Sequence, residues 1–307
     1  MKVYYDLTPS VGDTAVALGN FDGLHLGHQK VIASAVDARA QGLIPTVFTF
    51  AANPLTELGG RSGGEIITRE QKIHLLDELG VEQLYIITFS QVKDLSPEAF
   101  VDRILAGVCR AREVCCGFNF TFGSGGKATS ETLSRLCERR GIKAEVAGAV
   151  LSGGEPVSST RIRGLIAAGE VDEAAKLLGR PYGYCSEIQH GRKLGRELGA
   201  PTLNQAIPED FVLPRFGVYA SRVYVDGAVY AGVTNVGIKP TVGSPCALAE
   251  TWMPDYRGGE LYGRTVRVDL ITFIRPERRF SGLEELKAEI IRNGAQAKEY
   301  FEQSSGR

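Results

Sequence analysis

The sequence predicts an α/β protein with two domains, a helix-covered parallel sheet at residues 1–180 and a small antiparallel β-barrel with a terminal helix at residues 181–307. In the first half, short apolar runs alternate with segments of helical spacing. That alternation favours a parallel sheet with helices on both faces. After about residue 181, short strand-like runs follow one another closely and turn residues separate them, which favours a small barrel.

Five apolar runs in the first domain have the length and composition of buried strands. They span residues 14–18, 44–50, 84–89, 112–118 and 143–150. A helical pattern follows each of the first four runs, so the chain reads as successive strand–helix units of a parallel sheet.

Start and stop signals define the helices between these strands. The helix after residue 28 ends at Gly42. Thr68 with Gln71 three residues later forms a capping box at the start of the next helix. Ser96 followed by Pro97 predicts an N-cap and a first helical residue. A further helix is predicted over residues 130–141.

Two short helical patterns at residues 159–179 end the first domain. The runs "YGYCSEIQ", "GVYASRVYVDGAVYAGVTNVG" and "RTVRVDLITFI" then predict strands, and the Asp226-Gly227 pair inside the second run predicts a hairpin turn. A final helix is predicted from Ser281, with Glu284 completing a second capping box.

Composition limits the classes of function. The 307-residue chain is 43% apolar and 23% charged, carries a net charge of −1 and has no long basic block, so no nucleic-acid partner is indicated. No apolar run reaches membrane-spanning length and the N-terminus lacks a signal-peptide core, so we expect a cytoplasmic protein without a membrane partner, as a monomer or weak homo-oligomer. The six cysteines form no C-x-x-C pair and are expected to be reduced thiols; a zinc site or a nucleophilic cysteine is the alternative.

The stretch "LGNFDGLHLGHQKVI" (18–32) joins the first predicted strand to the first helix. Gly19 and Gly23 permit a tight turn and close approach of backbone N–H groups to an anion. His25 and His28 are three residues apart and fall on one face of the first helical turn if the helix starts near Leu24. There the helix N-terminus adds positive potential, so the segment suits a triphosphate. Turn glycines with unrelated histidines are the alternative.

Two known phosphate-binding motifs are excluded. The stretch has no G-x-G-x-x-G, and "GGKATS" has Ala128 where a P-loop needs Ser or Thr. A second polar cluster, "VSSTRIRG", places hydroxyls and guanidinium groups at the expected start of a helix, where they can hold a polyphosphate. An ordinary helix cap is the alternative for this cluster. Its polar members are Ser158, Ser159, Thr160, Arg161 and Arg163.

Together these motifs resemble a known family. "GNFDGLHLGH" with "VSSTRIR" resembles the nucleotidyltransferase module of bacterial bifunctional riboflavin kinase/FAD synthetases, and "CGFNFTFG" (116–123) resembles that family's flavin- and nucleotide-side loop. "GRKLGRELGAPTLN" (191–204) resembles the flavokinase signature with its P-T-x-N, and "TNVGIKPTVG", "AETW", "ELYG" and "IRPERRF" follow in family order. The resemblance implies a Rossmann-like nucleotidyltransferase domain followed by a flavokinase-like barrel.

For the first module, the resemblance implies transfer of AMP from ATP to FMN, which gives FAD and pyrophosphate without a covalent enzyme intermediate. His25 and His28 would contact the phosphates, and Ser159, Thr160 and Arg163 would grip the β- and γ-phosphates. The nucleotide pocket would be lined by Gly19, Phe21, Asp22, Gly23 and Asn119. Three further aromatics, Phe118, Phe120 and Phe122, offer a stacking wall, or else pack in the core.

For the second module, the resemblance implies phosphorylation of the riboflavin ribityl hydroxyl by ATP, which gives FMN. Thr202 and Asn204 would hold Mg²⁺ and the ATP phosphates, and Glu250 would be the general base. Arg275 would lie on the flavin side. Gly191, Lys193, Gly195 and Gly199 would form a loop over the phosphates. Without the family, Thr202 and Asn204 share one face of a strand, which fits paired ligands and equally an exposed edge.

The chain departs from the family pattern in three places. "FAANP" (50–54) stands where relatives usually have a D-P-H-P-like stretch, so Asn53 replaces an ionisable residue and adenylyl transfer is expected to be weaker or rearranged. Pro254 follows the "AETW" segment, and Asn293 with Gly294 stands where relatives carry an acidic residue. Two alternatives stay open, a riboflavin kinase with a weakened or lost adenylyltransferase module and a flavin-binding regulatory or storage protein.

Overall fold

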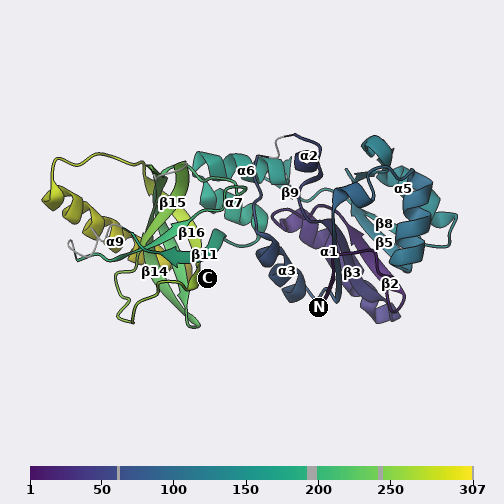
Figure 1. Ribbon diagram of the computed structural model, residues 1–307, viewed down its shortest axis with the longest axis horizontal. Helices are drawn as coiled ribbons and strands as arrows, with labels where there is room; N and C mark the ends of the chain where they lie inside the picture. The colour runs from purple at the N-terminus through teal and green to yellow at the C-terminus, as the bar shows by residue number, and fades with distance from the viewer. Residues whose placement is uncertain (61–62, 192–198, 241–244, 306–307) are drawn as a thin grey trace. The chain divides into compact units, whose positions relative to one another are not determined.

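The computed structural model describes residues 1–60, 63–191, 199–240 and 245–305. The chain divides into two compact units, Met1–Ser159 and Thr160–Arg307 (Figure 1). The first unit contains a parallel sheet with helices, and the second contains a closed antiparallel barrel with a C-terminal helix. The predicted fold class is therefore confirmed, whereas the domain boundary at residue 180 stays a prediction.

The first unit is built on a sheet that, within its described residues, has six strands in the order β1-β4-β3-β2-β5-β8. Every neighbouring pair is parallel. The five strands predicted from the sequence are all present; β1 was not predicted because it has only three residues. The bounds are β1 Lys2–Tyr4, β2 Thr14–Leu18, β3 Ile44–Phe50, β4 Gln83–Ile87, β5 Ala111–Gly117 and β8 Lys143–Ala147.

Helices connect these strands. Thr68 and Gln71 form the predicted capping box, and Ser96 caps the helix that Pro97 begins. That helix continues with wider turns as a π-helix, since the N–H of Cys109 reaches the carbonyl of Ile104 five residues earlier. The bounds are α1 Leu26–Asp37, η1 Ala38–Gln41, α2 Pro54–Glu57, α3 Arg69–Glu78, η2 Phe89–Gln91, α4 Pro97–Ala99, η3 Phe100–Val108, η4 Ser124–Gly126 and α5 Ser130–Glu138. The short hairpins are β6 Thr121–Phe122 with β7 Ala128–Thr129 and β9 Leu151–Ser152 with β10 Glu155–Pro156.

The two faces of this sheet are covered by different helices. Alternate residues such as Val16 and Leu18 of β2 pack with Leu105 of η3 and Leu133 of α5 in one buried cluster. Helix α1 contacts β2, β3, β5 and β8, and its buried side chains include Ile32. Because neighbouring strands are parallel, their carboxyl ends share one edge, and the loop after β2 opens there.

The second unit starts with α6 (Ser159–Ala168) and α7 (Val171–Leu178), followed by a barrel closed in the order β11-β12-β15-β14-β13-β16. Asp226 and Gly227 both have positive φ, 51° and 78°, so the predicted hairpin turn is confirmed. The bounds are β11 Tyr182–Gln189, β12 Thr202–Ala206, β13 Gly217–Val225, β14 Ala228–Pro240, β15 Pro245–Trp252 and β16 Thr265–Arg275.

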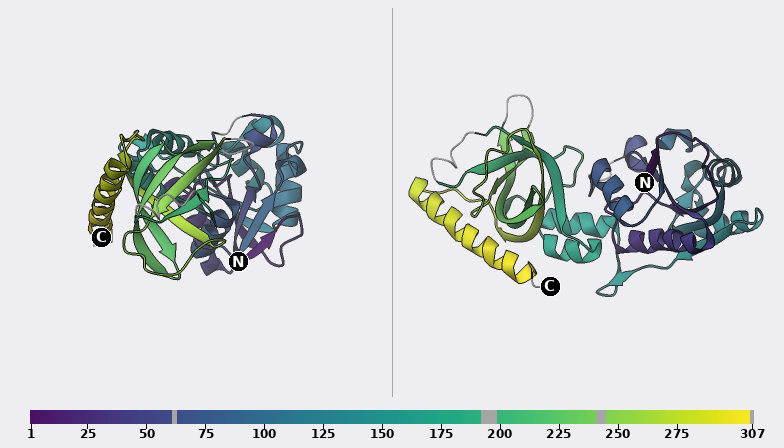
Figure 2. Two further views of the ribbon diagram at one scale, coloured as in Figure 1. Left: turned by 60° about the vertical axis from the view of Figure 1, so that its left-hand side comes forward. Right: turned by 90° about the horizontal axis from the view of Figure 1, so that it is seen from below.

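Helix α9 (Leu283–Ser305) lies along the outside of the barrel, against β13 and β14 (Figure 2). The predicted capping partner was wrong: Glu285, not Glu284, accepts hydrogen bonds from the N–H and hydroxyl of Ser281. The helix begins at Leu283, so its third residue is Glu285, the position from which a carboxylate reaches back. Gly294 faces Trp252 so closely that an added Cβ would lie 2.6 Å from the indole.

Candidate active sites

The loop between β2 and α1 has an unusual backbone. Phe21 and Leu24 have positive φ values of 51° and 43°, and Gly23 has φ 80°. For residues with a Cβ this conformation is strained and persists only where the surroundings fix it, as often happens at functional sites. Gly23 also lacks room for a side chain, since a Cβ would lie 3.0 Å from Ile66. The predicted tight turn is therefore present.

His25 caps α1. Its Nδ1 accepts a hydrogen bond of 3.2 Å from the backbone N–H of His28, so the helix begins at Leu26 and not near Leu24. The two imidazole rings stack, with centroids 3.6 Å apart and planes inclined by 16°. A Cβ at Gly27 would lie 3.1 Å from the His25 ring. The glycine between the histidines thus leaves space for the capping ring against the first turn.

This arrangement sets the protonation of the histidines. Because Nδ1 of His25 accepts a hydrogen bond, a neutral His25 carries its proton on Nε2 and can donate from there. Burial holds the pKa of His28 well below its ordinary value, and the neighbouring His25 and the Lys72 ammonium lower it further. Nδ1 of His28 is buried and has no hydrogen-bond partner in the described part of the chain. Two neutral imidazoles therefore stand at a positively polarised helix N-terminus.

Several hydrogen bonds fix the loop. The Asp22 carboxylate accepts from the N–H of Ile66 at 2.9 Å, and the Ser159 hydroxyl donates to the Asp22 carbonyl at 2.9 Å. The Asn20 carbonyl accepts from the Lys72 ammonium at 3.0 Å and from the Thr49 hydroxyl at 2.9 Å. The predicted residues Asp22 and Ser159 therefore meet at the turn from Gly19 to His28, here called the histidine turn, and their hydrogen bonds anchor it.

Sequence reasoning missed Lys72 and Glu65 in this region. Lys72 is buried on α3, and Glu65 precedes that helix. Burial and the Asp22 carboxylate, which is hydrogen-bonded to Glu65, raise the pKa of Glu65 to about 7. Nothing in "TREQKIH" distinguishes Lys72 from a solvent-facing helix lysine, so its burial had no signal in the sequence.

The remaining predicted residues of this region lie on two segments. Asn119 is exposed in the loop after β5, where Phe118 is 51% exposed. Phe122 is buried with its ring tilted against that of Phe100. Of the two roles predicted for this aromatic, stacking wall or core packing, it has the second. Thr160 and Arg163 lie in the first turns of α6, which belong to the second compact unit.

Asn53 of the departing "FAANP" stretch has a structural role. It is the N-cap of α2, and its Oδ1 accepts a hydrogen bond of 3.0 Å from the N–H of Leu55. Pro54 occupies the first helical position, as is common. The stretch therefore starts a short helix that an uncharged side chain caps.

On the barrel, three polar residues form a row across neighbouring strands. Asn204 of β12 pairs in register with Glu250 of β15, and Glu250 pairs with Asn235 of β14. Side chains directly opposite one another in a sheet share a face, so Asn204, Glu250 and Asn235 project together. The alternate residues Gln205 and Thr251 are fully buried. The predicted residues Asn204 and Glu250 are therefore adjacent, although 46 positions separate them in the sequence.

The side chain of Asn204 is buried and closely approached by the backbone of Gly191. It is 6% exposed, and its Oδ1 is buried without a hydrogen-bond partner among the described residues. A Cβ on Gly191 would lie 2.4 to 2.6 Å from the amide group of Asn204. Thr202 lies two residues earlier on the same strand face. A buried amide oxygen lacking a partner, with a hydroxyl beside it, is an oxygen donor set of the kind that suits Mg²⁺.

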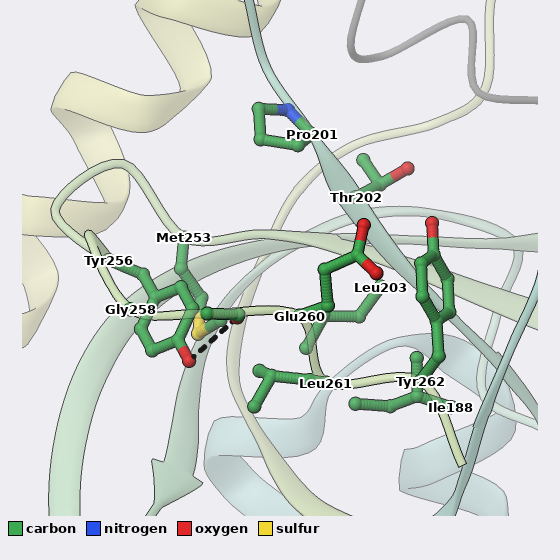
Figure 3. Close-up of a pocket in the computed structure, with 11 residues that line it drawn as sticks. Ile188, Pro201, Thr202, Leu203, Met253, Tyr256, Gly258, Glu260, Leu261 and Tyr262 are labelled. Carbon is green, nitrogen blue, oxygen red and sulfur yellow. Dashed lines mark hydrogen bonds between the residues drawn. The ribbon is translucent and has the colours of Figure 1, made fainter. Parts of the chain in front are cut away.

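A pocket of about 420 Å³ opens beside Thr202 (Figure 3). Ile188, Leu203, Met253 and Leu261 supply apolar walls. Figure 3 shows the Glu260 carboxylate and the Tyr262 hydroxyl on the Thr202 side of this space. The apolar walls and polar rim suit a ring system with a polar substituent. Glu260 and Tyr262 belong to the "ELYG" motif, to which no role had been assigned.

Arg275 lies at the end of β16. Its guanidinium pairs with Glu289 of α9 at 3.0 Å and donates to Asn293 at 3.1 Å. Burial lowers the pKa of Arg275, and the Glu289 carboxylate acts in the opposite direction by stabilising the charged guanidinium. Asn293 thus accepts a hydrogen bond at a position where an acidic residue was expected. In the predicted phosphate-covering loop, Gly191 and Gly199 are described, while Lys193 and Gly195 lie outside the described residues.

Several described cysteines are buried as protonated thiols. Cys116 and Cys137 are buried, and burial raises the pKa of each to about 11, so both are protonated at neutral pH. Cys115 lies near Glu113 and Glu145, but Lys143 pairs with Glu113 at 2.9 Å and balances its charge. The expectation of free thiols is confirmed for the five cysteines whose side chains the structure describes.

Comparison with known proteins identifies both units. A profile for FAD synthetase matches residues 8–161, and a profile for riboflavin kinase matches residues 178–301. The chain is 36% identical to the bifunctional riboflavin kinase/FMN adenylyltransferase of Bacillus subtilis, covering 94% of this chain and 92% of that protein. It is 32% identical to the Escherichia coli K12 protein of the same name, covering 93% and 92%.

A solved structure has the same fold along nearly the whole chain. It is a crystal structure described as a macrolide-efflux protein from Streptococcus pneumoniae, with a TM-score of 0.88 and 29% identity. The similarity covers 96% of this chain and 98% of that one. In the described part of the present chain, no helix is both long enough and apolar enough to cross a membrane.

Proposed function

Because the chain belongs to the bifunctional riboflavin kinase/FMN adenylyltransferase family, we propose that the histidine turn and the Asn204–Glu250 row are its two reaction centres. The enzyme phosphorylates riboflavin to FMN and adenylylates FMN to FAD with release of pyrophosphate, and ATP is the co-substrate of both reactions. The observation that carries this function is the match of both family profiles on one chain, at residues 8–161 and 178–301.

In adenylyl transfer, the FMN phosphate attacks the α-phosphorus of ATP and pyrophosphate leaves. The protein forms no covalent bond, so it acts by positioning the reactants and stabilising charge. His25, with its proton on Nε2, donates to a phosphate oxygen, and His28 lies stacked beside it. The N-terminus of α1 adds positive potential where charge develops.

Other residues complete the nucleotide site. Ser159, Thr160 and Arg163 bind the β- and γ-phosphates at the start of α6. The exposed Asn119 and Phe118 form the wall on the flavin or adenine side, and the Gly19–Gly23 turn lines the pocket. The buried Asn20 Oδ1, which lacks a described partner, supports a polar ligand at this turn.

In the kinase reaction, Glu250 accepts the proton of the ribityl hydroxyl as that oxygen attacks the γ-phosphorus. Thr202 and Asn204 would hold Mg²⁺, and the Oδ1 of Asn204, which has no hydrogen-bond partner among the described residues, fits this role. When bound, Mg²⁺ neutralises phosphate charge. The pocket beside Thr202 receives a ring system of one of the two substrates. Gly191 and Gly199 lie on the phosphate side, and Arg275, held by its ion pair with Glu289 of α9, lies on the flavin side.

Asn53 keeps one alternative open. Its side chain caps α2 and, as an amide, carries no charge that could stabilise the phosphates. A riboflavin kinase with a weak adenylyltransferase is therefore the second candidate. We also propose a cytoplasmic location and a monomer or weak homo-oligomer that acts on small molecules.

One incubation separates these candidates. Purified protein is mixed with riboflavin, ATP and Mg²⁺, and the flavins are resolved by chromatography. Accumulation of FAD is expected. Accumulation of FMN alone selects the kinase with an impaired first module, and flavin binding without ATP consumption overturns the proposed function.

A further inference from the structure

Lys72 is an unusual residue for a helix surface, because it is only 6% exposed. Burying a lysine is unfavourable unless its ammonium group finds partners. The ammonium donates a 3.0 Å hydrogen bond to the Asn20 carbonyl, the same oxygen that accepts from the Thr49 hydroxyl. A buried lysine and a fully buried threonine therefore converge on one backbone carbonyl at the start of the histidine turn.

That carbonyl belongs to a turn that needs external support. Phe21 and Leu24 keep positive φ values although each has a side chain. Such residues relax to ordinary backbone conformations unless neighbouring contacts prevent it. The bond from Lys72 fixes the first peptide of the turn, before the strained Phe21. The shape of this turn then places His25 as the N-cap of α1.

Lys72 also places a positive charge behind the histidines. The charged and titratable groups around it are Asp22 of the turn, Glu65 before α3, Arg69 of α3 and His28 of α1. Asp22 and Glu65 are hydrogen-bonded to each other and stabilise the ammonium, while burial and Arg69 oppose it. Burial and the stacked His25 lower the pKa of His28 most, and the Lys72 ammonium adds to them.

We propose that Lys72 is a positioning residue for adenylyl transfer. It holds the Asn20 carbonyl so that the turn stays in its strained shape. This inference rests on the proposed function, since it assigns a supporting role at the proposed adenylyltransferase centre. Without the ammonium, the turn relaxes and the histidine pair loses its fixed geometry.

The test compares FAD formation from FMN and ATP in the full-length wild type, Lys72→Met, Lys72→Arg and the exposed-lysine control Lys93→Met. Lys72→Met keeps the aliphatic stem but removes donor and charge. We expect its kcat to fall about 10- to 100-fold, because small displacements of positioned groups have effects of that size. The acid limb of its kcat/KM profile should move to higher pH, whereas Lys72→Arg should leave that limb in place and Lys93→Met should behave as wild type.

Different outcomes test the role of Lys72 and the proposed adenylyltransferase function. Wild-type protein that forms no FAD overturns the proposed function. If the wild type forms FAD, an unchanged acid limb in Lys72→Met, or an equal shift in Lys72→Arg, overturns the role of Lys72. Circular dichroism checks folding. If Lys72→Met does not fold, Thr49→Val decides, because it removes the other donor to the Asn20 carbonyl: a fall in kcat is expected, and an unchanged kcat refutes the argument.

Discussion

Gly191→Ala tests the kinase centre through a single added methyl group. The new Cβ would lie 2.4 to 2.6 Å from the amide of Asn204, whereas ordinary contacts begin near 3.4 Å. Since the amide is buried against neighbouring strands, either it or the Gly191 backbone must move by about 1 Å. Displacements of this size at a positioned group can lower a rate about 100-fold. We therefore expect kcat for FMN formation to fall about 10- to 100-fold, or about 1.4 to 2.7 kcal/mol of transition-state stabilisation.

The assay follows FMN formation from riboflavin under saturating ATP and Mg²⁺, with FAD formation from supplied FMN as the internal control. Asn204→Ala sets the scale of the loss. Gly282→Ala is the matched control, because a Cβ there meets no atom within 4 Å. If Gly191→Ala retains wild-type kcat while Asn204→Ala is inactive, the close approach of Gly191 to Asn204 does not position the amide, and the geometric reasoning is wrong.

Three further predictions concern separate parts of the molecule. His28→Ala should abolish FAD formation and leave FMN formation nearly intact, while Glu250→Ala should do the reverse when FMN is supplied; equal loss of both activities in either variant would contradict independent centres. Burial and Asp22 raise the pKa of Glu65 to about 7, so the stability from its protonated form is full below its ordinary pKa and disappears as pH rises through about 7; thermal unfolding should show a smaller decline over this range for Glu65→Gln. Thr68→Ala should lower the free energy of unfolding by about 1 kcal/mol through loss of the capping box, measured by denaturant titration, and an unchanged midpoint would count against that cap.

Local signals in the sequence were enough for the elements of the fold. The capping box at Thr68, the Ser96–Pro97 helix start and the Asp226-Gly227 hairpin depend on residues close together in the chain, and the structure has all three. The Glu284 cap failed because the helix starts at Leu283, and a shift of one residue changes which carboxylate reaches back. Such boundary errors are expected where neighbouring residues are chemically alike.

Long-range partners could not be predicted in the same way. The resemblance named Asn204 and Glu250 separately, but only the register of β12 with β15 places them side by side. Lys72 resembled any helix lysine, and its burial depends on the loop after β2 lying above α3. Local sequence predicts which residues carry polar groups, and strand register and helix packing decide which of those groups meet.

Both proposed centres have a glycine directly beside a polar side chain. At the histidine turn, Gly27 leaves room for the His25 ring, and a Cβ there would lie 3.1 Å from it. At the barrel, Gly191 leaves room for the Asn204 amide at an even shorter distance. Neither glycine has the positive φ that a turn would require, so conformational freedom does not explain them. The reason is close approach of backbone to a functional group, which limits the rotamers of that group and so fixes it before a substrate arrives.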